Sequence, residues 1–254
     1  MKQKERLQSI LRMLQEDPVV DVKSMAESFN VTPKTIRLDL KLLANSGHLE
    51  RIHGGAIRPK DDSDFTIKKT RSSHQEEKKA IARKALTFIQ ENDVILLDSG
   101  STTLEVAKLL GDFNVAVITN DIFIINELAN KRHVTLYVVG GMVQNVADHF
   151  TIIGEDAVSF VRKYHTTKTF ISTSAIDLDK GTSIYYYGDS STKRAFMDAG
   201  EINYCLVDSS KFGHFGFRKV ADIDELQNII TDKNISPEDY QKLKKHNINV
   251  YIGE

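Results

Sequence analysis

The sequence predicts an α/β protein in two parts, a small unit of three helices and two short strands followed by a larger unit with a mostly parallel sheet. The chain has 254 residues, which exceeds one ordinary domain of ~150 residues. Residues 1–60 hold 11 Lys and Arg against 7 Asp and Glu, a formal charge of +4, whereas the remainder carries −5. Beyond residue 74, apolar strand-like runs alternate with amphipathic helical stretches, which is typical of a sheet with helices on both faces.

Composition excludes several classes of protein. Hydrophobic residues make up 41% of the chain and charged residues 27%, which is usual for a globular protein, and Gly and Pro are too few for a disordered one. The longest apolar runs, such as 94–97, have four residues, far short of the ~20 that a membrane-spanning helix needs. The charged N-terminus does not resemble an export signal, so we expect a cytoplasmic protein that meets no membrane. The lone Cys205, expected to be a buried apolar residue, cannot form an internal disulfide, and the scattered histidines lack metal-ligand spacing, so we expect no cofactor and no metal.

Three short helices are predicted in the first 47 residues. The first stops before Asp17-Pro18, since proline breaks a helix. The second follows Asp21, a good N-cap, and the third follows Thr32 with Pro33 in its first position, where a missing N–H costs nothing. Their apolar faces consist of Leu7, Ile10, Leu11 and Leu14; Val22, Met25, Ala26 and Phe29; and Ile36, Leu40 and Leu43. Two such helices joined by a turn of about four residues, here spanning about 20–40, are typical of a helix-turn-helix.

Residues 36–42 conflict with that interpretation, because apolar and polar side chains alternate there as in a half-buried strand. Thr32-Pro33 in front and Asn45-Ser46-Gly47 behind are start and stop signals of a helix, so we expect a helix. Periodicity alone would also suit a helical module for dimerisation or capping.

The segment from His48 to Ile57 consists of two strand-like pieces around a Gly-Gly turn, which predicts a wing at about 48–58 beside the third helix. In a winged helix-turn-helix the third helix enters the major groove of DNA, and a guanidinium such as that of Arg37 can pair with guanine. The residues expected to contact double-stranded DNA are Thr32, Lys34, Thr35, Arg37, Lys41, Arg51 and His53.

Polar residues in the larger unit gather where the predicted strands end, the edge at which such sheets bind ligands. Residues 98–103, Asp-Ser-Gly-Ser-Thr-Thr, follow a strand and open a helix, and so offer hydroxyls and backbone N–H groups to a phosphate. Such a loop is often a plain connection, and the absence of a Walker A pattern disfavours nucleotide hydrolysis. Two further lysines, one in the first turns of a helix and one after the last long strand, can pair with an anion. The residues expected to bind a small phosphate-bearing effector are Asp98, Ser99, Gly100, Ser101, Thr102, Thr103, Thr119, Asn120, Gly140, Gly141, Lys193 and Lys211.

These residues also carry a family resemblance. The stretches TPKTIRLDL at 32–40 and RIHGGA at 51–56 resemble the DeoR-type bacterial transcription regulators, and the later segments resemble that family's sugar-phosphate-sensing domain. The resemblance implies a larger domain similar to ribose-5-phosphate isomerase, with the four segments at 98–103, 119–120, 140–141 and 210–213 lining a sugar-phosphate pocket. Leu38 departs from the family, which usually has a second arginine there, and the aromatic stretch at Tyr185–Tyr187 is also unusual; it either packs a strand or shapes sugar selectivity.

Two functions follow as alternatives. We expect a DNA-binding repressor of carbohydrate genes, a homodimer or homotetramer released from its operator by a phosphorylated sugar, with a DNA-binding domain at 1–58, a linker at 59–73 and an effector domain at 74–254. The alternative is a sugar-phosphate isomerase whose N-terminal module serves assembly. An isomerase needs a carboxylate base, and only Asp98 and Asp177 lie near the pocket segments. A sensor needs only different affinities in two conformations, so we expect no enzyme.

Overall fold

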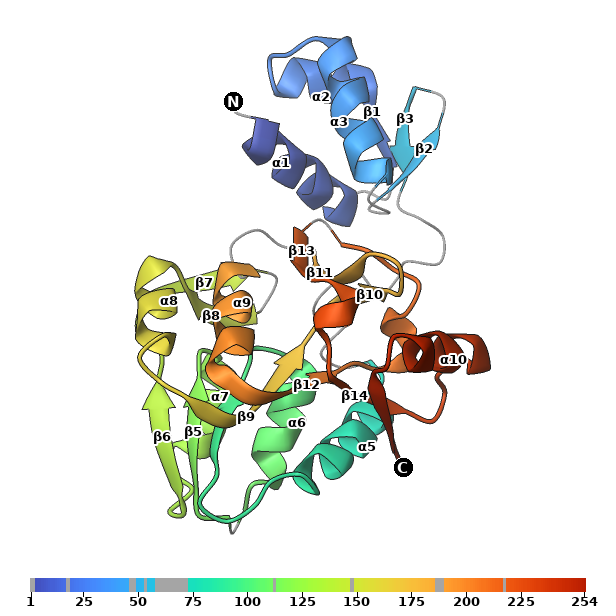
Figure 1. The fold of residues 1–254 in the computed structure, drawn as a ribbon. Coiled ribbons are helices and arrows are strands. Elements are labelled where there is room, and N and C mark those ends of the chain that lie inside the picture. Colours follow the sequence, from blue (N-terminus) through green and yellow to red (C-terminus); the bar gives the residue numbers. More distant parts are fainter. Residues whose placement is uncertain are drawn as a thin grey trace. The chain divides into compact units, whose positions relative to one another are not determined.

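The computed structural model describes residues 3–16, 19–45, 49–52, 54–57, 73–111, 113–146, 149–185, 190–216 and 218–254. The chain divides into two compact units, residues 1–69 and 70–254 (Figure 1). The predicted linker at 59–73 lies almost entirely outside the described residues, so its nature stays a prediction. In the described part, no helix is both long and apolar enough to cross a membrane.

The N-terminal unit contains the three predicted helices. They are α1 (Gln3–Glu16), α2 (Val22–Ser28) and α3 (Pro33–Asn45). Asp21 caps α2 as expected, because its carboxylate accepts hydrogen bonds from the backbone N–H groups of Lys23 and Ser24, both at 2.9 Å. The alternating stretch 36–42 is helical, since Ile36, Leu40 and Leu43 all face one buried cluster.

The wing has one strand more than the sequence suggested. Strands β2 (Glu50–Ile52) and β3 (Gly55–Ile57) pair antiparallel, and β1 (Val19–Asp21) pairs with β3 on its other side. Three residues between two helices gave no alternating pattern long enough to indicate a strand. Gly55 permits this pairing, because a Cβ there would lie 2.1 Å from the carbonyl oxygen of Val20.

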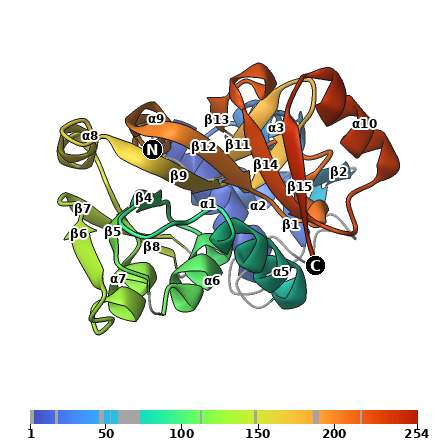
Figure 2. The same ribbon diagram turned by 60° about the horizontal axis from the view of Figure 1, so that its bottom comes forward.

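The C-terminal unit is built on a seven-stranded parallel sheet with strand order β15-β14-β12-β9-β4-β5-β6 (Figure 2). This confirms the predicted mostly parallel α/β fold. The strands are β4 (Val94–Leu97), β5 (Val115–Thr119), β6 (Val134–Val138), β9 (Thr166–Ser172), β12 (Gly200–Leu206), β14 (Asn228–Asp232) and β15 (Asn249–Gly253).

Helices cover both faces of this sheet. On one face, α5 (Gln75–Leu86), α6 (Ser101–Leu109) and α7 (Ile122–Leu128) pack in a cluster that includes Ile95, Leu97 and Phe170. On the other face, α8 (Glu155–Val161) and α9 (Ser190–Ala199) pack on Leu96 and Ile118. The side chains of β4 therefore alternate between two cores, as the period of a strand requires.

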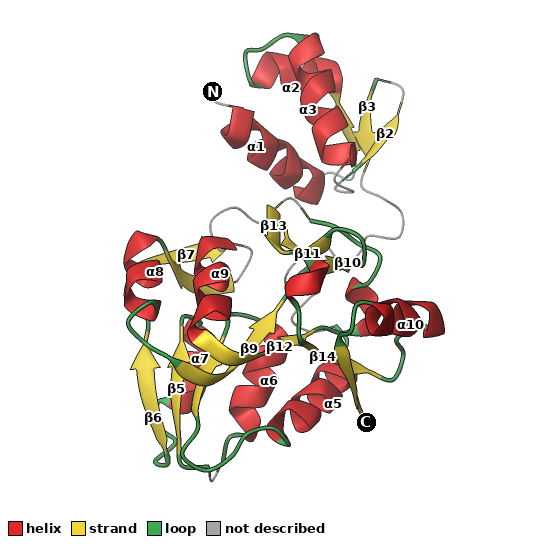
Figure 3. Ribbon diagram, in the orientation of Figure 1, coloured by secondary structure: helices red, strands yellow, loops and turns green. Residues whose placement is uncertain are grey.

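The C-terminal unit contains several elements that the sequence patterns did not predict, and Figure 3 shows them among the helices and strands of the structure. They are β7 (Met142–Val146) and β8 (His149–Ile153), which form a hairpin; β10 (Ala175–Asp177), β11 (Gly181–Ile184) and β13 (Arg218–Ala221), which form a small antiparallel sheet; the short turns η1 (Ser209–Lys211) and η2 (Ile223–Glu225); and β14, α10 (Pro237–Lys245) and β15. The helix α10 and the small sheet cover a third cluster that includes Cys205. Burial there raises the pKa of the Cys205 thiol to about 12, so Cys205 is the inert apolar residue that was predicted.

Candidate functional site

The outward face of α3 carries three of the cations predicted to meet DNA. Lys34, Arg37 and Lys41 are all exposed, whereas Ile36 and Leu40 on the opposite side of the helix are buried. Since the described acidic side chain of this helix, Asp39, is itself buried, the exposed face is positively charged. Such a face can bind the phosphates and base edges of a DNA groove.

Thr32 and Thr35 shape the start of this helix. The hydroxyl of Thr32 accepts a hydrogen bond from the backbone N–H of Thr35 at 3.2 Å and lies 2.9 Å from the hydroxyl of Thr35. This is the N-cap arrangement that the sequence predicted for Thr32. The two hydroxyls therefore fix the end of α3 that a helix-turn-helix places in the groove.

A buried ion pair that the sequence did not reveal holds α3 on α1. Arg6 Nε lies 2.5 Å from Asp39 Oδ2, and Arg6 Nη2 donates to Asp39 Oδ1 at 3.3 Å. Gln3 Nε2 also donates to Asp39 Oδ1, at 3.2 Å. A polar residue between Leu38 and Leu40 was the only signal, and nothing in the sequence paired it with Arg6. The bidentate contact fixes the rotation of α3, and thus which side chains face outward.

The wing supplies one more exposed cation, Arg51 on β2. The backbone N–H of Val22 donates to the carbonyl of Gly54 at 2.8 Å, which ties the turn of the wing to the start of α2. His53, the other predicted wing contact, lies outside the described residues.

The predicted effector residues follow strands that are neighbours in the sheet. Residues 98–103 follow β4, Thr119 ends β5 and Asn120 follows it, Gly140 and Gly141 follow β6, and Lys211 follows β12. Chain order reverses between β4 and β9, because β5 and β6 continue to one side and β9, β12, β14 and β15 to the other. In open parallel sheets, the carboxyl ends of the strands at such a reversal form the usual ligand site.

A buried ion pair lies at this reversal. Lys193 of α9 pairs with Asp98 Oδ2, and both side chains are buried. The ammonium of Lys193 also lies 3.4 Å from the carbonyl oxygen of Ser99 and 3.3 Å from that of Ser172 at the end of β9. Asp98 Oδ2 accepts a further hydrogen bond from the backbone N–H of Ser172 at 3.0 Å. Three segments, after β4, at the end of β9 and on α9, are thus joined by one cation and one carboxylate.

The loop after β4 is held tightly around this pair. Ser172 Oγ donates to the carbonyl of Ser99 at 2.6 Å, and Thr103 Oγ1 donates to the carbonyl of Asp98 at 2.6 Å. A Cβ on Gly100 would lie 2.7 Å from Ser172 Cβ, so only glycine fits there without a shift. Ser172 was not among the predicted effector residues, although it ends a predicted strand. Gly100 caps α6 without a side chain, which leaves the first N–H groups of this nine-residue helix uncapped by it.

Asn120 provides a second polar group at the same edge. Its side chain is fully buried, and Nδ2 donates to the carbonyl of Ile152 at 3.0 Å. Its oxygen Oδ1 is buried and accepts no hydrogen bond from the described residues. Thr119 Oγ1, by contrast, is used within the fold, because it accepts from the N–H of Asp121 at 3.2 Å. A buried acceptor without a donor is costly, and the hydroxyl of a ligand would satisfy it.

Three further predicted residues, Gly140, Gly141 and Lys211, lie on other segments. Gly140 and Gly141 line an open hollow of about 470 Å³ whose other walls come from α8 and the residues just after it, Asp156, Ser159, Phe160 and Lys163. Lys211, in η1, is half-buried, and its side chain makes no ion pair with the described residues.

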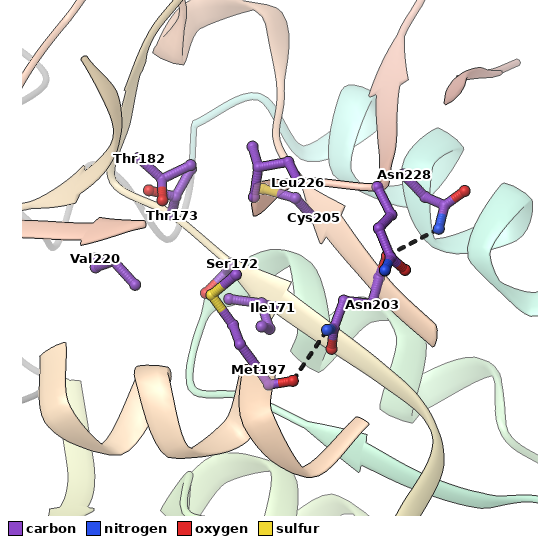
Figure 4. Close-up of a pocket in the computed structure, with 11 residues that line it drawn as sticks. Ile171, Ser172, Thr173, Thr182, Met197, Asn203, Cys205, Val220, Leu226 and Asn228 are labelled. Carbon is purple, nitrogen blue, oxygen red and sulfur yellow. Dashed lines mark hydrogen bonds between the residues drawn. The ribbon is translucent and has the colours of Figure 1, made fainter. Parts of the chain in front are cut away.

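An enclosed cavity on the α9 side of the sheet is too small for a sugar. It has a volume of about 10 Å³ and lies between Met197 of α9, the strands β9, β12 and β14, and the small sheet (Figure 4). Asn203 and Asn228 line this cavity. The side chain of Asn203 donates to the carbonyl of Met197 at 2.9 Å, and that of Asn228 donates to the carbonyl of Asn203 at 3.1 Å. One water molecule is the largest occupant that such a volume admits.

Comparison with known proteins matches both units. Residues 6–62 match the DeoR-like helix-turn-helix domain, and residues 73–233 match the DeoR C terminal sensor domain. The L-fucose operon activator of Haemophilus influenzae is 34% identical over 243 residues, which cover 94% of this chain and 96% of that protein. The glycerol-3-phosphate regulon repressor of Escherichia coli K12 is 29% identical over 253 residues, which cover 99% of this chain and 100% of that protein.

Among solved structures, ribose 5 phosphate isomerase A from Neisseria gonorrhoeae aligns with a TM-score of 0.37 and 18% identity, over 54% of this chain and 53% of that chain. This chain therefore matches about half the length of that enzyme. The two domain matches together span both units in the order found here, and the exposed cationic face of α3 lies within the first of them. The chain belongs to the DeoR family of transcription regulators.

Proposed function

We propose that this protein is a repressor of carbohydrate genes that binds operator DNA through α3 and the wing and leaves it when a phosphorylated sugar binds the C-terminal unit. The observation that carries the DNA-binding part is the outward face of α3, where Lys34, Arg37 and Lys41 are exposed and the carboxylate of Asp39 is buried against Arg6. Arg37 would contact a base, while the two lysines and Arg51 of the wing would contact phosphates. His53 stays a proposed wing contact.

The effector site would lie where β4 and β9 end. The uncapped N–H groups at the start of α6 suit a phosphate, and the buried oxygen of Asn120 suits a sugar hydroxyl. Lys193 would be a positioning residue, since its ammonium contacts three protein oxygens and holds the start of the loop 98–103 against the end of β9. Lys211 would supply the charge that meets the phosphate, with Gly140 and Gly141 at the margin of the site.

Two relatives support a ligand of this class, because one is named as the repressor of a glycerol-3-phosphate regulon and the other as an activator of an L-fucose operon. Ligand binding would change the spacing of paired recognition helices in a homodimer or homotetramer, since two half-sites must be matched at ~34 Å or a multiple along DNA. A coupling of about 1–3 kcal/mol would change operator affinity roughly 5- to 150-fold.

The carboxylates near the site favour sensing over turnover. Asp98, one candidate base of an isomerase, is buried against Lys193. Burial would raise the pKa of Asp177, the other candidate, but the hydrogen bond from the Lys180 ammonium and those from the backbone N–H groups of Asp179 and Lys180 lower it below the usual value. A carboxylate with a lowered pKa is a weak general base.

The DNA-binding part is tested by titrating the full chain into a labelled duplex from its own promoter region while fluorescence anisotropy is recorded. We expect affinity to fall steeply with salt, and we expect Arg37→Ala to weaken binding by about 1–3 kcal/mol. Arg162→Ala, which removes an exposed arginine from the C-terminal unit, is the matched control and should bind like the wild type. Equal affinities for both variants would remove Arg37 from the interface.

The sensing part is tested by thermal unfolding with phosphorylated pentoses and hexoses, the same sugars without phosphate, and inorganic phosphate alone. A ligand at ~100 times its Kd should stabilise the protein by about 2.7 kcal/mol. Lys211→Ala should abolish this response and spare DNA binding, whereas Lys245→Ala, an exposed lysine of α10, should change neither. Conversion of any of these sugar phosphates by the purified chain would instead support the isomerase alternative.

A further inference from the structure

The helix α3 exposes two leucines among its cations. Leu38 is 55% exposed and Leu42 is 49% exposed, although both lie on a helix whose other leucines are buried. Single exposed apolar residues are common on protein surfaces, but these two lie one turn apart on one face. Together with Lys34, Arg37 and Lys41 they make up the whole exposed surface of this helix from its second residue to Leu42, apart from the half-buried Thr35.

Helical geometry places Leu38 at the centre of this surface. With about 3.6 residues per turn, the direction opposite the buried stripe of Ile36, Leu40 and Leu43 falls between Lys34, Leu38 and Lys41. Leu42 and Arg37 lie on the two flanks. Leu38 therefore points toward any partner of α3 next to Lys34, with the cations on one side of it and Leu42 on the other.

The occupant of such a surface must be anionic where it meets the cations and apolar where it meets Leu38. No exposed carboxylate of α3 opposes an anion, because Asp39 is buried against Arg6. The major groove of B-DNA has this character, since phosphates line its edges and the 5-methyl group of thymine projects into it.

We infer that Leu38 is a specificity-determining residue that packs on the 5-methyl group of a thymine in each half of the operator. This inference rests on the proposed DNA binding. It assigns the apolar contact to Leu38 and not to Leu42, because the N-terminal half of a recognition helix reaches the bases and Leu42 lies in the following turn, on the flank.

The test uses the full chain and a duplex selected by the wild-type protein from a random library. Each thymine of the selected duplex is replaced singly by deoxyuridine, which removes only the 5-methyl group, and affinities are measured by anisotropy at one salt concentration. At one thymine in each half-site, the wild type should bind the uracil duplex about fourfold more weakly, which corresponds to the ~0.8 kcal/mol of one buried methyl group.

Three variants make the result specific. Leu38→Ala should bind the parent duplex more weakly and lose the preference for thymine over uracil at that position, while Leu38→Met, which keeps an apolar side chain, should retain it. Leu42→Ala is the matched control, because it removes an equally exposed leucine from the same face, and it should keep the fourfold preference. Thermal unfolding of all three should match the wild type, since both leucines are half exposed.

The possible outcomes are distinguishable. A thymine preference that survives in Leu38→Ala, or that is lost in Leu42→Ala alone, overturns the inference while leaving DNA binding in place. If Leu38→Ala only lowers the sedimentation coefficient of the free protein, the surface is covered by a second copy of this chain and the inference is wrong. If the wild type selects no duplex at any salt concentration, the proposed function fails together with it.

Discussion

Both units contain a carboxylate and a cation that are buried against each other, but the two pairs do different things. In the N-terminal unit, the guanidinium of Arg6 makes two contacts with Asp39 and joins helix α1 to helix α3. In the C-terminal unit, the ammonium of Lys193 contacts Asp98 and two carbonyl oxygens, and joins the loop after β4 to the end of β9 and to helix α9. The first pair fixes which side chains α3 presents outward, and so would influence the proposed DNA binding without contacting DNA. The second pair includes Asp98, the first residue of the segment 98–103 that is proposed to bind phosphate.

The difference follows from the donors. A planar guanidinium matches both oxygens of one carboxylate and therefore fixes an orientation. An ammonium is a compact charge with three donors, so it can hold several oxygens from different segments together. A helix that is proposed to read a DNA groove requires a fixed orientation, whereas a loop that is proposed to surround a ligand requires several segments held at one point.

The largest effect is expected from breaking the N-terminal pair. Asp39→Ala leaves the Arg6 guanidinium buried without its carboxylate, which should cost about 3–5 kcal/mol. This is comparable with the whole stability of a small domain, so DNA binding should be lost and the N-terminal unit should unfold at lower urea. Urea titration followed by circular dichroism, with anisotropy on DNA, measures both.

The control is the double variant Arg6→Met with Asp39→Leu, which replaces the ion pair by apolar side chains of similar size. We expect it to recover most of the stability and the DNA affinity, since neither side chain is proposed to touch DNA. A double variant as unstable as Asp39→Ala would show that the polar contacts themselves stabilise the unit.

The C-terminal pair should respond differently to the same treatment. Lys193→Met removes the cation paired with the buried Asp98 carboxylate, and should cost about 3 kcal/mol and the ligand response while operator affinity stays. In the double variant Asp98→Leu with Lys193→Met, stability should return but the ligand-induced thermal shift should not. Recovery of the ligand response in the double variant would contradict the proposed role of this pair.

A smaller effect is expected from crowding the loop above that pair. Gly100→Ala places a Cβ 2.7 Å from Ser172 Cβ and should destabilise the C-terminal unit by about 1–3 kcal/mol, with a weaker ligand response. Gly111→Ala is the matched control, because nothing lies within 4 Å of the Cβ position there. Thermal unfolding of both variants with and without ligand measures the difference, and equal curves would show that the loop has room.

The smallest effect concerns a pair at the other end of the same two strands, where Lys168 Nζ lies 2.6 Å from Asp93 Oδ2. Burial raises the pKa of Asp93, but the hydrogen bonds from Lys168, the N–H of Gln90 and the hydroxyl of Thr167 outweigh it and leave the pKa below its ordinary value. The stabilisation is therefore complete above the unfolded pKa of ~3.9 and is lost as pH falls through the folded pKa.

We expect Asp93→Asn to cost about 1 kcal/mol at pH 7 and to make the free energy of unfolding less dependent on pH in the acid range. Urea titrations at a series of acid pH values provide the measurement. If the free energy of unfolding of Asp93→Asn depends on pH as steeply as that of the wild type, other carboxylates determine the acid sensitivity.

Local signals predicted much of the fold. Asp21 and Thr32 cap helices as their side chains predict, and the apolar patterns that predict a strand at 115–119 and a helix at 190–199 correspond to β5 and α9. The missed elements lack such signals. Strand β1 is three residues long and pairs with β3, which lies more than thirty residues later in the sequence. The β7–β8 hairpin follows β6 at a place where the sequence predicted no further strand.

The candidate sites divide in the same way. Lys34, Arg37 and Lys41 were predicted to face outward because helical period alone separates them from the apolar stripe, and they do. The buried state of Lys193 could not be predicted, since its partners come from residues 98, 99 and 172, which adjoin it only in the folded sheet.

By itself, the sequence determined the two-part organisation, the helix-turn-helix and the parallel sheet, because caps, turns and apolar periods act over a few residues. The tertiary structure alone decided which charges are buried together, because burial depends on neighbours that are distant along the chain.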